Sequence, residues 1–215
     1  LQLRGGTTSE HSSFTGAARE VTVDTTKKTL VVHDGSQAGG TPLMKESGGS
    51  RDALINSVRV GKGINSVGGN TVLGELALDA AVTGQNNTAI GKSTLTDLTS
   101  GTQNTCCGSF AGTAITTGNN NVAIGNNALA AVTTQSSNVA IGRDALESTT
   151  TSNQVAIGFK ALEASTTGAN NIAMGYAALQ NNVSGESLVA IGTTALNTNT
   201  TGDSCVAVGR NALFA

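Results

Sequence analysis

Large aromatic side chains are almost absent from this chain. Its 215 residues include no tryptophan, one tyrosine and four phenylalanines, so aromatic residues make up 2% of the total. Aromatic side chains supply much of the buried area in a wide globular core. Their scarcity excludes such a core and leaves room only for a thin one.

Charge, proline and cysteine are scarce as well. Charged residues are 12% of the chain, the net charge is −2, and like charges do not gather in blocks. This pattern argues against an electrostatic surface for nucleic acid or for a membrane. No apolar run approaches the roughly 18 residues of a membrane span, so we expect no membrane insertion. The three cysteines, of which Cys106 and Cys107 are adjacent, cannot form a disulfide framework.

Glycine, by contrast, is abundant, and nine of the 28 glycines recur at a regular interval. Each follows two or three small apolar residues, and an Ala-Leu pair or a related pair comes three to four positions later. The interval between successive members is seventeen positions, except for one interval of sixteen. A period of this length indicates a repeat architecture, in which these glycines form structural turns. The predicted turn glycines are Gly74, Gly91, Gly108, Gly125, Gly142, Gly158, Gly175, Gly192 and Gly209.

Two irregularities accompany the repeat. The residue missing from the short interval is expected near Thr151 and Ser152, inside a polar turn, where a deletion disturbs packing least. A shorter copy of the pattern, residues 56–61, ends less than one full period before Gly74 and predicts one additional coil at the start.

The repeat favours an all-β fold, a parallel β-roll or β-solenoid. In Val122-Ala123-Ile124 the side chains alternate, so Val122 and Ile124 share one face and Ala123 takes the other. Each repeat unit can hold two short strands and two turns, and glycine and asparagine tolerate the positive φ of such turns. A helical solenoid would need longer units, and Gly, Thr and Asn would interrupt every helix. About nine coils are expected, spaced ~4.8 Å apart.

The predicted core is thin. Each coil contributes about three good apolar residues, such as Val139, Ile141 and Leu146, and narrow objects bury a small fraction of their surface. The column of alanines on the second face is small and suits the close approach of another chain. We therefore expect a homo-oligomer, although the repeat does not give the number of chains.

The N-terminal residues differ in composition from the repeat. They contain both histidines and the single proline and lack the regular glycines. Residues 21–24 and 30–33 are β-rich and, with the residues between them, predict a β-hairpin. We expect an N-terminal β domain at 1–46, a Gly-Ser-rich linker at 47–55 and a repeat shaft at 56–215.

Two glycine runs superficially suggest phosphate binding. Gly91-Lys92-Ser93 has the end of a P-loop, but Asn86 stands where that motif requires its first glycine. Gly61-Lys62-Gly63 lacks the third glycine of a dinucleotide-binding loop. Turns between coils explain both runs, and we expect no cofactor.

No other residues form a convincing chemical site. His11 and His33 have no further ligands at metal spacing, so we expect no metal. Cys205 lies six coils from the adjacent cysteine pair, ~29 Å at the strand spacing, beyond disulfide reach. No ordered triad or catalytic carboxylate pair stands out, and the threonines cluster in turns rather than in the regular rows of an ice-binding face. We expect no enzyme.

The N-terminal residues resemble a known family. The runs 3–11, 14–17, 20–25 and 28–35 are similar to the small N-terminal domain of many phage tail fibres, which is related to the N-terminal part of the phage major tropism determinant. The resemblance implies a trimeric domain at the virion-proximal end of a receptor-binding fibre.

The repeats resemble the head of YadA-like trimeric adhesins, whose unit also centres on Val-Ala-Ile-Gly, and the repeat arrays of phage and bacterial surface fibres. The period of seventeen exceeds the usual YadA-head unit. The sequence shows no C-terminal membrane anchor, which counts against a complete autotransporter adhesin.

These observations predict a virion structural protein, a homotrimeric phage tail-fibre subunit. We expect the N-terminal domain to dock to other tail or baseplate proteins and the fibre to serve host attachment, with a surface receptor or glycan as partner. Exposed turns or a separate distal protein would make the host contact. The alternative is a bacterial trimeric adhesin at the cell surface. A glycan depolymerase is a third hypothesis, and it would need a carboxylate cluster in a groove between chains.

Overall fold

The computed structural model describes residues 4–13, 21–25, 29–32, 41–42, 45–46 and 52–213. These residues form a four-stranded and a twelve-stranded sheet. Among them only α1 (Thr8–Ser13) is helical. Its start is a capping box, since the Thr7 amide donates to Glu10 Oε2 at 2.6 Å and the Glu10 amide donates to Thr7 Oγ1 at 3.3 Å. The strands of the first sheet are β1 (Arg4–Gly6), β2 (Val21–Asp24), β3 (Thr29–Val32) and β4 (Thr41–Pro42).

The predicted hairpin is confirmed. Strands β2 and β3 are antiparallel, with Val21 opposite Val32 and Asp24 opposite Thr29. Thr22 and Val31 are buried, whereas Leu30 is exposed, as alternation along a strand requires. The connection 26–28 and the turn expected after residue 32, which includes His33, lie outside the described residues.

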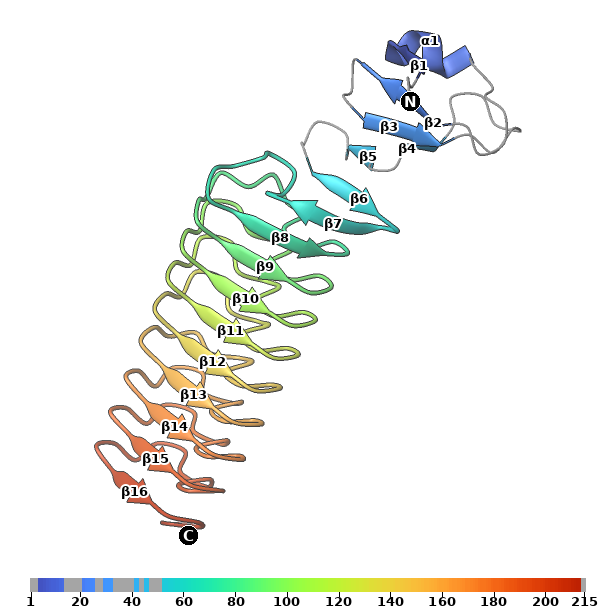
Figure 1. Ribbon diagram of the computed structural model, residues 1–215. Helices are drawn as coiled ribbons and strands as arrows, with labels where there is room; N and C mark the ends of the chain where they lie inside the picture. Colours follow the sequence, from blue (N-terminus) through green and yellow to red (C-terminus); the bar gives the residue numbers. More distant parts are fainter. Residues whose placement is uncertain are drawn as a thin grey trace.

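The second sheet runs the length of the repeat and confirms the predicted β-solenoid (Figure 1). Its first strands are antiparallel, and from β8 onward neighbouring strands are parallel, with Val122 opposite Val139 and Ala123 opposite Ala140. Its strands are β5 (Lys45–Glu46), β6 (Ala53–Ile55), β7 (Val58–Gly61), β8 (Thr71–Gly74), β9 (Thr88–Ile90), β10 (Thr105–Cys107), β11 (Val122–Ile124), β12 (Val139–Ile141), β13 (Val155–Ile157), β14 (Ile172–Met174), β15 (Val189–Ile191) and β16 (Val206–Val208).

The additional first coil expected at residues 56–61 is wrong. Strand β7 pairs with β8 antiparallel, with Gly61 opposite Val72. The stretch from Gly61 to Gly74 is shorter than one repeat unit and too short for a full coil, so the chain reverses instead of circling. Strand β6 lies within the segment expected as a linker and pairs with β7. The sheet therefore begins before residue 56.

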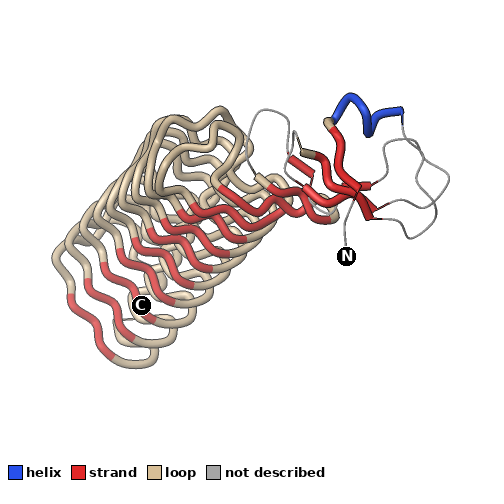
Figure 2. The backbone as a smooth tube through the Cα atoms, turned by 45° about the horizontal axis from the view of Figure 1, so that its top comes forward, coloured by secondary structure: helices blue, strands red, loops and turns tan. Residues whose placement is uncertain are grey.

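Each coil from β9 onward contains one three-residue strand, not the two that the sequence suggests. Figure 2 shows these strands together on one side of the roll, with loops forming the rest. In the coil around β11, Asn120 (φ 57°), Asn127 (φ 57°) and Leu129 (φ 54°) adopt the left-handed conformation. Three such corners bend the chain too often for a second extended segment. The residue missing from the short unit is lost before Ser152, whose hydroxyl accepts the Ser136 amide at a sequence separation of 16, where earlier coils have 17.

The two faces of each strand have the opposite orientation to the one expected, whereas Leu146 is buried as predicted. Ala123 is fully buried and belongs to the same cluster as Ala128 and Leu129, whereas Val139 and Ile141 point outward and keep part of their surface exposed. The enclosed space is already filled by a leucine column and, in the first coils, by a second branched column of Val82, Leu98, Ile115 and Val132, so only the alanine methyl group of each strand fits inside. The alanine column is therefore the core of the roll, not the surface for another chain.

A buried column of amides runs beside the core. Asn121 accepts the Asn138 amide through Oδ1 at 3.0 Å and donates through Nδ2 to the carbonyl of Gln135 at 2.9 Å. Gln154 takes this position in the coil that lacks a residue, and its longer side chain still reaches the carbonyl of Gly168. The column satisfies backbone groups that the turns leave unpaired, so asparagine does more here than tolerate positive φ. Its members are Asn70, Asn87, Asn104, Asn121, Asn138, Gln154 and Asn171.

Candidate functional site

The outward residues of strands β8 to β16 form an apolar surface, which we call the outer stripe. Ile124 is 40% exposed and Met174 39%. A fully exposed side chain of this size presents roughly 100 Å² of apolar area, so partial exposure at all members sums to on the order of 500 Å². Isolated soluble proteins rarely leave more than a few hundred Å² of contiguous apolar surface uncovered. The stripe consists of Leu73, Ile90, Val122, Ile124, Val139, Ile141, Val155, Ile157, Ile172, Met174, Val189, Ile191, Val206 and Val208.

The nine turn glycines stand at or directly after the ends of strands β8 to β16. Gly125 has a φ of +135°, and a Cβ added there would lie 2.6 Å from the carbonyl oxygen of Gly142 on the next coil. Neither the backbone conformation nor the close approach of the next coil admits a side chain. This geometry makes the glycine at position 125 a packing requirement of the roll.

The two glycine runs that suggest phosphate binding have their backbone amides occupied. The amides of Lys62 and Gly63 donate to the carboxylate of Asp52 at 2.6 and 2.7 Å. The Gly91 amide donates to the carbonyl of Leu73, and Lys92 Nζ lies 3.3 Å from Glu75 Oε2. A phosphate would need these donors, so the structure supports the turn interpretation of both runs.

The cysteines are free thiols in the structure. Cys106 is fully buried in the core, and burial raises the pKa of its thiol to about 12. Cys107 points to the outer side of β10 and Cys205 is partly buried. Within the described residues no group of three or more His, Cys, Asp and Glu could hold a metal ion. His11 lies in α1, but its side chain, like the whole of His33, lies outside what the structure describes.

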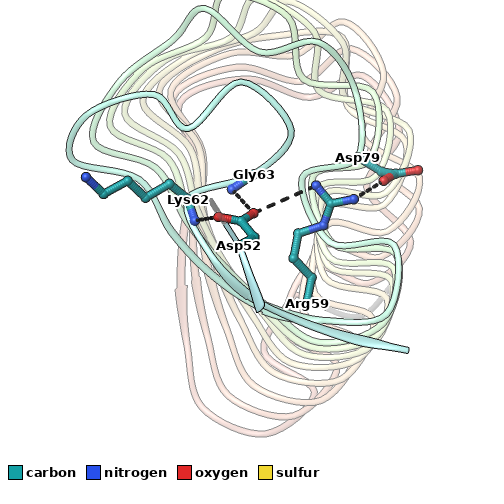
Figure 3. Close-up of polar contacts among 5 residues, drawn as sticks. All are labelled: Asp52, Arg59, Lys62, Gly63 and Asp79. Atoms are coloured by element: carbon teal, nitrogen blue, oxygen red, sulfur yellow. Dashed lines mark hydrogen bonds and ion pairs between the residues drawn. The ribbon is translucent and has the colours of Figure 1, made fainter. Parts of the chain in front are cut away.

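An ion-pair cluster that lies outside the repeat pattern joins the β6–β7 hairpin to the roll (Figure 3). Arg59 Nη2 lies 2.5 Å from Asp79 Oδ1, and Arg59 Nη1 lies 3.9 Å from Asp52 Oδ2. Asp52 is 1% exposed and Arg59 7%. Arg59 is the cation that faces both carboxylates, so removing its charge would destabilise the cluster. The cluster has no nucleophile beside a base, so we assign it a structural role. The signal was absent from the sequence, because these residues follow no period.

A second cluster lies on the middle coils, where Arg143 and Tyr176 are exposed and Phe159 is partly buried. Arg143, Phe159 and Tyr176 each follow a turn glycine on successive coils. Arg143 Cζ lies 4.5 Å from the centroid of the Phe159 ring, and the Phe159 and Tyr176 centroids are 5.5 Å apart with an interplanar angle of 31°. Tyr176 is 54% exposed. We call these three residues the aromatic stack.

Ionised side chains surround the stack. Lys160 Nζ lies 2.8 Å from Glu163 Oε1, and this hydrogen bond raises the pKa of the lysine. Gln180 Nε2 donates to Glu163 Oε2 at 2.6 Å. Burial, with the nearby carboxylate of Asp144, raises the pKa of Glu147. The area therefore offers hydrogen-bond donors and acceptors of both charges beside one exposed and one partly buried ring.

Comparison with known proteins bears on the N-terminal residues. Residues 1–37 match the family model described as the Major tropism determinant N-terminal domain. The "Tail fiber receptor-binding protein" of Bordetella phage BPP-1 is 67% identical over 45 residues, which are 21% of this chain and 12% of that protein. A solved structure, "Major Tropism Determinant U1 Variant", is 40% identical over 28% of this chain and 20% of its own, with a TM-score of 0.20.

These matches confirm the resemblance that the sequence indicates. The N-terminal residues of this chain are similar to the N-terminal domain of phage tail-fibre proteins of the major tropism determinant type, in agreement with a location on the virion. The chain spans 12% of the length of the curated relative, and the match covers 21% of this chain, which is far less than the roll. None of the described helices is long and apolar enough to cross a membrane.

Proposed function

We propose that this chain is a structural subunit of a phage tail fibre, attached to the particle through its N-terminal domain. The match of residues 1–37 to a tail-fibre domain carries this proposal. A domain at 1–46 docks to other tail or baseplate proteins, and a shaft from residue 56 projects the fibre from the particle. Residues 47–55 connect the two parts, and β6 within them already pairs with the sheet of the shaft.

Self-association into a homotrimer completes the proposal. Covering the outer stripe would contribute roughly 10 kcal/mol, if each partly exposed Val or Ile adds somewhat under 1 kcal/mol. That gain is of the same size as the roughly 4–15 kcal/mol that association costs, so covering the stripe favours self-association but does not set its affinity. The count of three chains rests on the resemblance of the domain and of the repeat to trimeric fibres.

The proposed role is mechanical and assigns no catalysis to the chain. The similar proteins are named as fibre and tropism proteins, and neither name denotes an enzyme. The name of the curated relative includes receptor binding, and we extend that role to this fibre as attachment to a host surface. Several weak contacts along one rigid rod add to firm adhesion when the geometry allows them to engage together.

Labelling of intact particles tests the proposal. Antibodies raised against residues 52–213 and coupled to gold should decorate the tail appendages of the phage that carries this gene. An antibody against the N-terminal domain should label the attachment end of the fibre once the particle has been dissociated. Gold on bacterial cell surfaces in the absence of phage would contradict the proposal and favour the adhesin alternative.

A further inference from the structure

The middle coils of the rod contain a local group of charged and aromatic side chains. Between residues 98 and 202 the chain has six charged residues, and five of them lie within 143–163. Phe159 and Tyr176 are two of the three aromatic residues in the same span. Shaft stability does not require this concentration, because coils without charged or aromatic residues have the same backbone. A local function explains it better.

The column of the aromatic stack has no aromatic residue after Tyr176, and we call the position beyond the Tyr176 ring the open step. Phe159 lies on one side of Tyr176, and the residue that follows Tyr176 in the same column is Thr193, then Arg210. Thr193 and Arg210 are exposed. Successive coils are ~4.8 Å apart, so two coils separate Tyr176 from Arg210 by ~10 Å with only a threonine between them. That space admits one ring stacked on Tyr176.

The chemistry around the step fits a saccharide. A pyranose presents C–H groups on one face, which pack on an aromatic ring, and hydroxyl groups around its rim. Beside the step, Thr194 donates to Asn211 Oδ1, and the Asn211 amide group and the Arg210 guanidinium supply donors for those hydroxyls. Glu163 and Gln180 provide acceptors and donors near the stack.

A protein partner fits this surface less well. Stable protein interfaces bury about 800 Å² on each side around an apolar centre from which charged residues are depleted. Here two rings stand among Arg143, Lys160 and Glu163. We infer that the step between Tyr176 and Arg210 binds one pyranose residue of a cell-surface polysaccharide, stacked on the Tyr176 ring.

This inference rests on the proposed role in host attachment and names the class of receptor. A shallow site with one stacked ring binds a single sugar weakly. Each trimer carries three copies and each particle carries several fibres, so many weak sites act together on a repeating polymer. The structure thereby assigns part of the host contact to the shaft.

The chain contains its own reporter for the test. It has one tyrosine and no tryptophan, so its ultraviolet-excited emission comes from Tyr176. The full-length protein is titrated with a panel of oligosaccharides built from glucose, galactose, mannose, rhamnose, N-acetylglucosamine or glucuronic acid. At least one member should change the tyrosine emission by tens of percent in a saturable manner, and the same saccharide should protect Tyr176 from quenching by acrylamide.

Variants then assign the response. On a column of the responding saccharide, retention should fall at least tenfold for Tyr176→Ala and remain for Tyr176→Phe, which keeps the ring. Phe110→Ala removes an aromatic side chain that is 42% exposed and lies outside the stack, and it should bind as the wild type does. Circular dichroism confirms that each variant keeps its fold.

Two results would overturn the inference. The first is no change in emission with any panel member at tens of millimolar, although acrylamide quenches Tyr176 normally. The second is a Tyr176 that acrylamide does not reach in the assembled protein, which would place the stack in a contact between chains. Both leave the gold labelling of particles unaffected, so they separate this inference from the proposed function.

Discussion

Replacing Asn121 with alanine tests how the coils are held together. In the structure its Nδ2 donates to the Gln135 carbonyl at 2.9 Å and to Asn104 Oδ1 at 3.1 Å, and its Oδ1 accepts the Asn138 amide at 3.0 Å. Asn121 and Asn138 are fully buried. The Asn121→Ala variant therefore loses two buried hydrogen bonds and one partly buried one, and it leaves the Asn138 amide without its acceptor.

The expected cost follows from the worth of buried hydrogen bonds. Each contributes about 1 kcal/mol net, and an amide left buried without an acceptor adds to the penalty. We expect the free energy of unfolding to fall by roughly 3–4 kcal/mol. For a chain of this size 1 kcal/mol corresponds to about 2–4 °C, so the melting temperature should fall by roughly 6–16 °C.

Thermal and urea unfolding, followed by circular dichroism, measure this cost. Asn126→Ala is the matched control, because Asn126 is exposed and its side chain makes one hydrogen bond, to the Ser109 carbonyl at 3.1 Å. The control should change stability by no more than about 0.5 kcal/mol. All proteins are compared at one concentration, since association stabilises the fold. A difference below about 1 kcal/mol between the two variants, the worth of a single hydrogen bond, would refute the role assigned to the buried amide column.

Three further outcomes are expected. Gly125→Ala should yield little folded protein by circular dichroism, because its Cβ would lie 2.6 Å from a carbonyl oxygen of the next coil. Gly68→Ala should fold, because an added Cβ there meets nothing within 4 Å, and equal yields of the two variants would contradict the packing argument. Cys106 should resist alkylation at pH 8 until the protein unfolds, because the rise of its pKa from 9.0 to about 12 depletes the reactive thiolate about a thousandfold. Rapid alkylation of Cys106 in the folded protein, mapped by mass spectrometry, would disprove the burial. Ile124→Asp in the outer stripe should reduce the mass measured by light scattering to that of one chain, while Thr134→Asp on an exposed turn should not; an unchanged mass for Ile124→Asp would exclude the stripe as the interface.

The repeat could be predicted from the sequence because its period is visible directly. The β2–β3 hairpin was also predictable, since alternation and a polar connection suffice for it. Which face of a strand lies inside was not predictable in the same way. Val122, Ala123 and Ile124 show that alternation defines two faces, but only the width of the coil decides that the smaller residue is the one enclosed.

Other features differ in how much signal the sequence held. The buried amide column could have been predicted from the same periodicity. Its asparagines recur with the period of the repeat just before the strands, as at Asn87, Asn104, Asn121 and Asn138. The aromatic stack also occupies one position of successive units. The cluster of Asp52, Arg59 and Asp79 follows no period. It depends on how the β6–β7 hairpin meets the roll, so local sequence patterns could not reveal it.

The mass of the assembled protein in solution tests the central claim, a fibre built from copies that cover one another's outer stripe. Multi-angle light scattering on the purified full chain should give three times the 21.3 kDa of one chain. The mass should persist on dilution to micromolar concentration. A stable, folded species of 21.3 kDa would contradict the account, because the outer stripe would then remain exposed to water with no copy to cover it.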